Sequence, residues 1–473
     1  MPPAQTLIDR DLAVLWHPCG QMRDYVHSPP IEIVAAHGSR LRLADGREIV
    51  DGISSWWCKS LGHGHAALRA ALIAQADRFE HVIIANTTNA PLVRLCERLL
   101  AAANGFGPES WGAAAPPGRR PGHFGKVVFA DNGSTAVEVG IKLALQAQAQ
   151  LGRPERTRFA ALAHGYHGET VGALSVGDCG LYKDTFRPLL FPCLQLGPLP
   201  YRSGPADARW HDASAAWAAI ERQLEPAAAG LAAIIYEPVL QGAGGMRLYA
   251  PDLLVRLRAW ADHHQVLLIA DEIAAGLGRC GAMLASHLAA APGQPPTPAC
   301  LPDIAVLSKG LTGGFLPQAA VLTTDAVAQA FDAEWSEGRA FLHSTTYAGN
   351  ALAVAVANAV LDVYAAEDIL GRVATHGPLL AAGLAQLAGE RPYLADVRGI
   401  GMMAAVDLCA PGDGVVDPSL RTGYRIAQRA VARGALLRPL GDTLYLFPPL
   451  TVSPADAQEL ITILADSCRD IMG

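Results

Sequence analysis

The segment Asp303-Ile-Ala-Val-Leu-Ser-Lys-Gly310 decides the fold class. Its apolar run does not alternate with polar residues, which is typical of a strand buried on both faces of a sheet. Similar runs occur at 126–130 (KVVFA), 158–164 (RFAALAH), 231–238 (LAAIIYEP), 266–272 (VLLIADE) and 319–323 (AAVLT), with helical patterns among them. Buried strands that alternate with helices indicate an α/β fold with a mostly parallel sheet flanked by helices.

A second lobe is expected because 473 residues exceed what one hydrophobic core usually supports. The segment 41–51 (LRLADGREIVD) predicts a hairpin, since Asp45-Gly46 separates two alternating runs. Toward the end of the chain the pattern predicts a long Ala-rich helix at 351–366, strands near 404–406 and 444–447, and a closing helix from Pro454.

These elements assign both chain ends to one domain. We predict a large domain at 61–345 and a smaller α+β domain whose N-terminal part is 1–60 and whose C-terminal part is 346–473.

Composition and charge exclude several classes of partner. The net charge is −7, and no long Lys/Arg run supplies the basic surface that nucleic acid requires. No stretch reaches 18 uninterrupted apolar residues, and the segment 1–16 lacks the apolar core of a signal peptide. We therefore expect neither nucleic acid nor a membrane as partner, and a soluble, cytoplasmic protein.

Cysteine and histidine spacing predicts reduced thiols and no metal. The nine cysteines form no Cys-x-x-Cys pair, and their odd number argues against a complete disulfide framework. His63 and His65 lie close together, as do His164 and His167, but no carboxylate or thiolate accompanies either pair at metal-ligand spacing.

Lys309 lies where the carboxyl end of its strand is expected, and α/β sheets bind ligands at that edge. Taken alone it also fits a surface lysine in a turn, which is the commoner case. Asp271 directly follows the apolar residues of the upstream run 266–272 and is expected at the same edge. A partly buried carboxylate needs a cationic partner, and the protonated nitrogen of a pyridinium ring would serve. The alternative is an acid that caps the next helix.

Two further stretches follow predicted strands. In 131–136 (DNGSTA) the free N–H groups of a helix start and the hydroxyls of Ser134 and Thr135 suit a phosphate, although an ordinary N-cap is the alternative. In 164–169 (HGYHGE) Tyr166 offers an aromatic face for stacking on a ring, with core packing as the alternative.

In this order and spacing, the stretches resemble the class III aminotransferases of fold type I over nearly the whole chain. The resemblance implies pyridoxal 5′-phosphate (PLP) as cofactor, carried by Lys309 as a Schiff base, with Asp271 paired to the ring nitrogen. By the same resemblance Gly133, Ser134 and Thr135 hold the phosphate, Tyr166 and Ile273 cover the two ring faces, and Glu237 lies nearby.

Finer motifs resemble one branch of this class, the adenosylmethionine-8-amino-7-oxononanoate aminotransferases or diaminopelargonic acid synthases. These motifs are Trp16-His17-Pro18, Ser54-Ser55-Trp56-Trp57, 241–246 (QGAGGM), 437–441 (LRPLG) and 445–449 (YLFPP). The branch implies transamination of 7-keto-8-aminopelargonate to 7,8-diaminononanoate in biotin biosynthesis, with S-adenosylmethionine as the expected donor. Trp56, Trp57 and Tyr166 are then substrate-binding residues, while packing between lobes is the alternative for the tryptophans.

Two arginines compete for the substrate carboxylate. Arg438 lies among Leu436, Leu437, Pro439 and Leu440, so its guanidinium is expected to be a lone cation in an apolar wall that suits a long aliphatic acid. The resemblance assigns it that role, with a structural salt bridge as the alternative. Arg398 matches a V-R-G-x-G motif in which related class III enzymes bind an α-carboxylate.

Two stretches depart from the branch pattern. Many members have Tyr after Trp-His-Pro, where this chain has Cys19. The stretch 343–350 (HSTTYAGN) resembles the segment that reaches the partner subunit's phosphate, and Thr346 matches the phosphate-binding Thr, whereas Thr345 and Ala351 differ from the usual residues. The resemblance implies a homodimer with an active site shared between subunits.

The expected reaction is a ping-pong transamination in which Lys309 is both covalent anchor and general acid/base. Lysine and other amines remain open as amino donors. The alternatives are an ω-amino acid:pyruvate aminotransferase, a glutamate-semialdehyde-type aminomutase, and a non-catalytic PLP-fold binding module.

Overall fold

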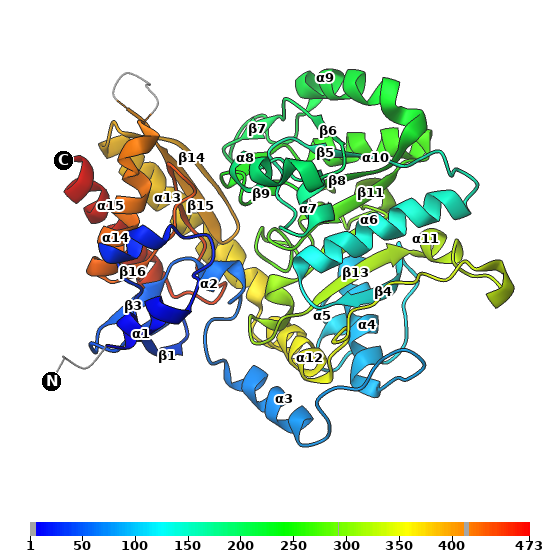
Figure 1. The fold of residues 1–473 in the computed structure, drawn as a ribbon, viewed down its shortest axis with the longest axis horizontal. Helices are drawn as coiled ribbons and strands as arrows, with labels where there is room; N and C mark the ends of the chain where they lie inside the picture. Colours follow the sequence, from blue (N-terminus) through cyan, green and yellow to red (C-terminus); the bar gives the residue numbers. More distant parts are fainter. Residues whose placement is uncertain (1–5, 292, 411–415) are drawn as a thin grey trace.

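The chain forms two lobes, one of which carries both ends of the described chain (Figure 1). A computed structural model describes residues 6–291, 293–410 and 416–473, so residues 1–5 of the predicted segment 1–60 lie outside the described residues. Helices α1 (Leu7–Val14) and α15 (Pro454–Met472) lie in the smaller lobe.

The larger lobe is built on a seven-stranded sheet. Its strands, in spatial order, are β4 (Phe124–Ala130), β13 (Ala319–Thr324), β12 (Ile304–Leu307), β11 (Leu267–Asp271), β8 (Leu231–Tyr236), β5 (Arg158–Leu162) and β6 (Cys193–Leu196). Neighbouring strands from β12 to β6 pair in parallel, which confirms the expected mostly parallel sheet.

Strand β13 is the exception, because it runs antiparallel to both β12 and β4. The apolar pattern of this run does not distinguish its direction from that of the others. The connection from β12 to β13 holds only a 3-10 turn, Lys309–Thr312. A parallel return requires a crossover of a dozen or more residues, usually a helix, so this short connection reverses the chain.

Both faces of the sheet are buried, as the unbroken apolar runs predict. Along β12, Ile304 and Val306 pack in the cluster that includes α6 (Gly133–Gln150), whereas Ala305 and Leu307 pack in the cluster that includes α4 (Ala90–Ala103) and α12 (Ala351–Ala366). Helix α10 (Asp252–His264), together with α9 (Ser214–Leu224), contributes to a third cluster on β8 and β11.

The smaller lobe joins distant parts of the chain in one sheet. Strands β1 (Ile33–His37), β2 (Arg40–Leu43) and β3 (Glu48–Asp51) are followed in that sheet by β16 (Ala435–Leu436), which runs parallel to β3. The predicted hairpin is confirmed, because Leu41 pairs antiparallel with Ile49 and Gly46 takes a φ of 90° in the turn.

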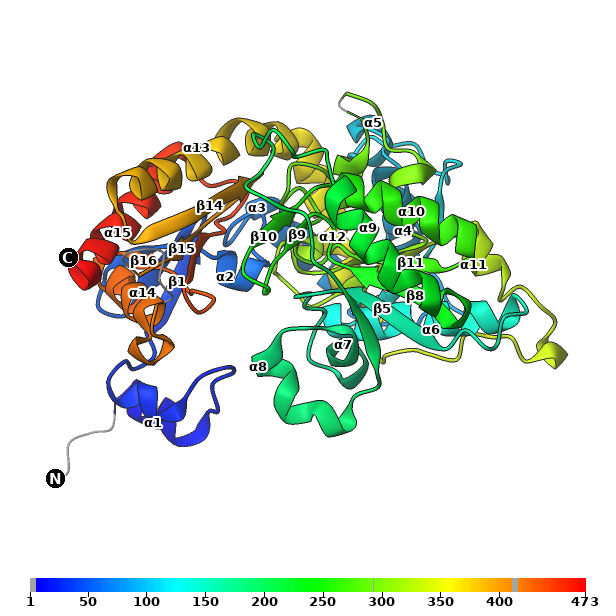
Figure 2. The ribbon, with the colours of Figure 1, turned by 90° about the horizontal axis from the view of Figure 1, so that it is seen from above.

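A three-stranded antiparallel sheet completes this lobe. It consists of β14 (Leu394–Ile400), β15 (Met403–Leu408) and β17 (Thr443–Leu446). Helix α13 (Ile369–Glu390) covers β14 and β15 and packs against α15, as Figure 2 shows, and α15 also packs on α14 (Thr422–Arg433). Helix α12 packs instead on α3 (Ala66–Ala76) and α4, so the domain limits at 60 and 345 stay a prediction.

Within the described ranges, no helix combines the length and apolarity needed to cross a bilayer. All nine cysteines are free. No group of three or more His, Cys, Asp or Glu side chains among the residues placed by the structure could hold a metal ion.

Candidate functional site

The carboxyl ends of the parallel strands bring the predicted residues to one edge of the sheet. Asp271 is the last residue of β11, Glu237 follows β8, and Lys309 follows β12 after Ser308. The turn that begins α6 follows β4, and the loop with Tyr166 follows β5. Because these strands are parallel, their ends converge on one place.

Lys309 opens a 3-10 turn with a φ of 39°, a left-handed conformation that non-glycine residues rarely adopt. Its Nζ lies 4.4 Å from the centroid of the Trp57 ring. Burial lowers the pKa of Lys309, and this effect outweighs the opposing influence of Asp271, Glu237 and Cys58. Relative to water, the site therefore stabilises the neutral form of the Lys309 amine over its charged form.

Asp271 is buried and makes two hydrogen bonds. Its Oδ2 lies 2.8 Å from Nδ1 of His167, and its Oδ1 accepts a bond from the Ile273 N–H at 3.1 Å. The His167 side chain is fully buried, and its Nε2 has no hydrogen-bond partner within the described part of the chain. The carboxylate is thus fixed in orientation at the strand end.

Glu237 is a second buried acid at this edge. Its Oε1 accepts a hydrogen bond from the Tyr166 N–H and its Oε2 one from the Gly242 N–H, both at 2.9 Å. Burial raises the pKa of Glu237 to about 7, and the nearby Asp271 adds to the effect. Glu237 ties the Tyr166 loop to the loop after β9 (Leu240–Gln241).

The turn at the start of α6 has the geometry of an N-terminal cap. Asn132 accepts a bond from the Thr135 N–H at 3.1 Å, and the Thr135 hydroxyl receives the Asn132 N–H at 3.2 Å. Thr135 is therefore engaged within the cap. The N–H groups of Gly133 and Ser134, in the first helical turn, have no intrahelical acceptor and point out of the helix start.

Ile273 and Gly168 border this turn. A Cβ atom on Gly133 would lie 2.9 Å from Cδ1 of Ile273, and one on Gly168 would lie 2.2 Å from Oγ of Ser134. Gly168, which also has a φ of 125°, therefore requires glycine, whereas a side chain at Gly133 would require Ile273 to move. The structure thus places Ile273 against Gly133 and Gly168 against Ser134.

Tyr166 lies in a partly buried aromatic group. Its ring meets Tyr182 edge-on at 5.8 Å, and its hydroxyl donates to Glu169 at 3.0 Å. Burial raises the pKa of Tyr166 well above its usual value, and Glu169 acts in the same direction. The ring is a neutral apolar surface beside the site.

The two predicted tryptophans take different positions. Trp57 is buried, donates its indole N–H to the Tyr445 hydroxyl at 3.1 Å, and packs on Phe447. Trp56 is 40% exposed, and the guanidinium carbon of Arg438 lies 4.5 Å from its ring centroid. One tryptophan thus adjoins Lys309 and the other adjoins Arg438.

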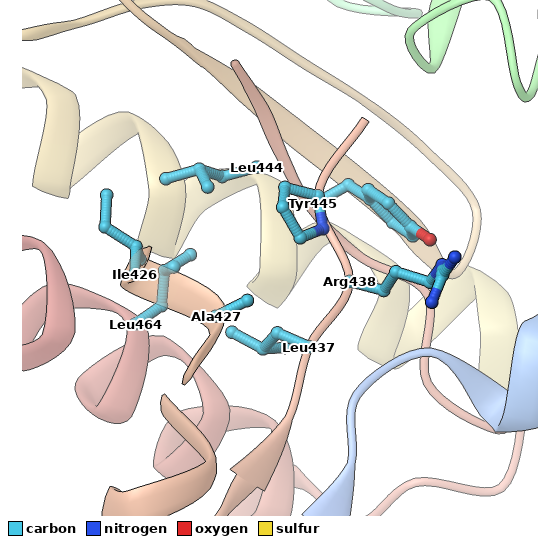
Figure 3. A pocket seen from close by; sticks show the side chains of 8 residues that line it. Ile426, Ala427, Leu437, Arg438, Leu444, Tyr445 and Leu464 are labelled. Atoms are coloured by element: carbon cyan, nitrogen blue, oxygen red, sulfur yellow. The ribbon is translucent and has the colours of Figure 1, made fainter. Parts of the chain in front are cut away.

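Arg438 is exposed and lightly held. Its only hydrogen bond to a described residue goes to the Cys19 carbonyl at 3.4 Å. Figure 3 shows Arg438 and Tyr445 directed away from the apolar side chains of Ile426, Leu437, Leu444 and Leu464. The hollow that these residues line has a volume of about 10 Å³, which is too small for a substrate. The guanidinium itself remains available to an anion.

Arg398 is held in the opposite way. It is buried and donates to the carbonyls of Met246, Gly245 and Asp396, and it forms an ion pair with Asp407 at 2.7 Å. Its hydrogen-bonding capacity is used within the chain. Of the two arginines that the sequence left in competition, Arg438 is the one with a free face.

The two departures from the branch pattern lie in different settings. Cys19 is exposed with a φ of 53°, and partial burial of its thiol, aided by Glu169, raises its pKa. The Thr345 hydroxyl donates to Asp131 at 2.8 Å, next to the turn of α6. Ala351 is buried at the start of α12.

Ser344 and Thr346 flank Thr345, and both are exposed. Thr345 is the member of this trio whose side chain bonds to a residue at the α6 turn. The phosphate contact of Thr346 therefore stays a prediction.

Two contacts at the site were not predicted from the sequence: that of His167 with Asp271 and that of Tyr445 with Trp57. The sequence presents His167 only as a candidate metal ligand, although it lies in the same stretch as Tyr166, and it presents Tyr445 as part of a motif without a role. The position of His167, directly after the predicted stacking residue Tyr166, was the one sign in the sequence that His167 lies at the site. Nothing in the sequence pairs Tyr445 with Trp57, since the contact depends on the packing of distant segments.

Comparison with known proteins agrees with this geometry. The family model of the class III aminotransferases matches residues 22–467. Adenosylmethionine-8-amino-7-oxononanoate aminotransferases of Geobacter sulfurreducens and Synechococcus elongatus are each 38% identical to the chain. The alignments cover 99% of this chain and 98% of the relative in the first case, and 97% and 99% in the second.

Solved structures show the same likeness. The adenosylmethionine-8-amino-7-oxononanoate aminotransferase of Methanocaldococcus jannaschii superimposes with a TM-score of 0.87 at 29% identity, over 98% of this chain and 99% of that one. A PLP-bound amine transaminase from an uncultivated Pseudomonas species gives a TM-score of 0.84 at 33% identity, over 97% and 99%. With a fold of type I and a family match over nearly its whole length, the chain belongs to the class III aminotransferases.

Proposed function

We propose that this chain transfers an amino group to 7-keto-8-aminopelargonate with PLP as cofactor, and so forms 7,8-diaminononanoate in biotin biosynthesis. The observation that carries the proposal is the pairing of two cations with two adjacent tryptophans. Lys309 lies against Trp57 and Arg438 against Trp56. A substrate with a keto group near one end and a carboxylate at the other can present the keto group to Lys309 and the carboxylate to Arg438. The names of the relatives at 38% identity support the same reaction.

The residues present fit PLP by the chemistry of their donors. The N–H groups of Gly133 and Ser134 suit its phosphate, and the buried Asp271 suits a protonated ring nitrogen. Lys309 has its pKa lowered by burial, which suits an amine that must react as a nucleophile. Tyr166 and Ile273 are proposed to cover the two faces of the ring.

When bound, PLP supplies an electron sink for the carbanion that forms at the substrate carbon. Lys309 Nζ is proposed to take the proton from the donor's Cα and to return a proton in the second half-reaction. Asp271 is held in orientation by His167 and by the Ile273 N–H. Trp57, which packs against Tyr445 and Phe447, covers one side of Lys309.

The amino donor is proposed to be S-adenosylmethionine, as the relatives' names indicate. A donor screen with the 7-keto acid as acceptor tests this choice, with S-adenosylmethionine, lysine and simple amines as candidates. Turnover with pyruvate and a simple amine, but not with the 7-keto acid, would instead favour the amine transaminases that share the fold.

The first test concerns Lys309. Lys309→Ala should lower kcat by at least about 100-fold, because the covalent anchor and the proton carrier are lost together. It should also remove the visible absorbance of the lysine-bound cofactor. Lys126→Ala is the matched control, since Lys126 is exposed on β4 away from this edge. Full turnover by Lys309→Ala would contradict the proposal.

The second test concerns Arg438. Arg438→Ala should raise KM for the 7-keto acid by about 10- to 100-fold, the usual worth of hydrogen bonds to a carboxylate. Its KM for S-adenosylmethionine should change much less. Arg425→Ala removes an exposed arginine of α14 and should change neither constant. If Arg438→Ala binds the 7-keto acid as well as wild type, the substrate assignment is wrong.

We also propose a cytoplasmic homodimer with active sites shared between the subunits. Thr346 is exposed next to Tyr347, and Tyr347 together with the exposed Val82 and Ile83 forms an apolar patch that a second copy of the chain would cover. The rings of His81 and Tyr347 lie 5.2 Å apart, which joins the two segments of the patch. Nine free cysteines suit a reducing compartment.

A further inference from the structure

The turn Ser54–Trp57, labelled α2, has an unusual backbone. Its four residues have φ values of 48°, 46°, 67° and 73°, so the chain makes one turn of left-handed helix. L-residues resist this conformation because Cβ crowds the following carbonyl oxygen, and glycine is its usual occupant. None of the four is glycine, so the surrounding structure must hold the turn in place.

Hydrogen bonds anchor the turn at both ends. The Ser54 hydroxyl donates to the Phe447 carbonyl at 2.7 Å, and the Trp57 N–H donates to the Ile53 carbonyl at 2.8 Å. In the middle of the turn, the Ser55 hydroxyl donates to Oδ2 of Asp51 at 2.8 Å. Ser55 is thus the link between the strained turn and a carboxylate beneath it.

Asp51 is completely buried and is itself paired. His63 Nε2 lies 2.9 Å from the same Oδ2, and the Ile53 N–H donates to Oδ1 at 3.3 Å. Burial opposes ionisation of Asp51, but the bonds from His63 and Ser55 outweigh it and hold the pKa below its usual value. A buried carboxylate with fixed partners is a rigid support.

The turn faces two functional cations in different directions. Successive side chains on a helical turn diverge by about 100°, so two adjacent indoles can lie on two separate groups. Trp57 lies on Lys309 and Trp56 on Arg438. Ordinary extended or right-handed backbone at these four residues would aim the indoles elsewhere.

The strand that ends at Asp51 also lies beside the segment that carries Arg438. Asp51 is the register partner of Leu436 in the parallel pair of β3 and β16, and Arg438 follows two residues later. The Gly52 N–H bonds to the Leu436 carbonyl at 3.1 Å, and a Cβ on Gly52 would lie 2.6 Å from Cδ2 of Leu437. The turn and the arginine are therefore built on one strand pair.

We propose that Asp51, Ser55 and His63 are positioning residues that hold the left-handed turn and so fix the distance between the two ends of the substrate site. This network makes the pocket selective for acids of one chain length. The inference rests on the proposed function, because it assigns Lys309 and Arg438 to opposite ends of the substrate.

The test compares four variants of the holoenzyme. Ser55→Ala and His63→Gln remove one bond each from the network and should raise KM for the 7-keto acid about tenfold, with kcat within about twofold of wild type. Ser55→Gly loses the same hydroxyl but relieves the strain, so its KM should rise less than that of Ser55→Ala. His65→Gln is the control, because His65 bonds to Glu367 outside the network.

A spectroscopic signal separates positioning from general stability. The near-ultraviolet circular dichroism of tryptophan should change in Ser55→Ala and His63→Gln and stay unchanged in His65→Gln. Unchanged KM and unchanged dichroism in the first two variants would overturn the inference, as would an equal rise of KM in His65→Gln. If wild type fails to use the 7-keto acid while the dichroism still changes, the proposed function fails and the support for the turn stands.

Discussion

Among single residues, Glu237 gives the sharpest prediction about pH. Burial raises its pKa to about 7 in the folded protein, whereas an exposed glutamate in the unfolded chain has a pKa of about 4.3. Between these values the folded state binds more protons than the unfolded state, so this group lowers the free energy of unfolding as pH rises from about 4.5 to about 7.

Glu237→Gln removes that titration. The free energy of unfolding of Glu237→Gln minus that of wild type should therefore increase by about 2 kcal/mol between pH 5.5 and pH 7.5. The difference between their melting temperatures, measured at both pH values, should shift in favour of the variant. Glu272, whose pKa burial also raises to about 7, is present in both proteins and cancels in the comparison. A difference in melting temperature that is the same at both pH values would show that Glu237 is ionised throughout.

Residue identities at the sheet edge were predictable for a physical reason. Lys309 and Asp271 each follow or end an apolar strand, and parallel strands bring their carboxyl ends together whatever the rest of the chain does. The pairing of Asp271 with His167 was not predictable in this way. His167 lies in the loop after β5, and Asp271 is the last residue of β11. Only the packing of the sheet brings their side chains to within 2.8 Å of each other.

At the scale of elements, patterns of apolar residues predicted which segments are strands but not how every strand runs. An apolar run looks the same in both directions, and the length of a connection is the only local sign of its direction. The link between β12 and β13 is too short for a crossover helix, so that antiparallel pair was in principle readable from the sequence.

The left-handed turn at Ser54–Trp57 was not readable. Sequence rules associate positive φ with glycine, asparagine and aspartate, and none of these occurs in the turn. The conformation depends on bonds from Asp51 and from the Phe447 carbonyl, which lie in other elements. The motif itself marked the segment as functional, while tertiary contacts determined its shape.

At the scale of the whole molecule, the site is assembled from both lobes. Lys309 and Asp271 come from the large sheet, whereas Trp56 and Arg438 follow the strand pair β3 and β16, which joins the two ends of the chain. Bonds such as that between Ser54 and the Phe447 carbonyl join segments far apart in the sequence. With the roles proposed for Trp56 and Arg438, substrate selection depends on the contact of the Ser54–Trp57 turn with Lys309 as well as on the sheet edge.

Thr346 extends this argument to a second subunit. It is exposed beside the apolar patch and is proposed to contact the phosphate in the partner's site. Thr346→Glu should abolish cofactor binding, because a carboxylate beside the phosphate repels it. Lys309→Ala should also be inactive by itself, because it lacks the covalent anchor and the proton carrier.

Mixed dimers of these two inactive variants decide whether the sites are shared. In such a dimer, one site combines an unchanged Lys309 from one subunit with an unchanged Thr346 from the other, so that site is intact. Random re-association of equal amounts should then restore about a quarter of the wild-type activity. Co-purification through two different tags confirms that mixed dimers form. If mixed dimers form and stay inactive, Thr346 serves its own subunit, and the apolar patch needs another explanation.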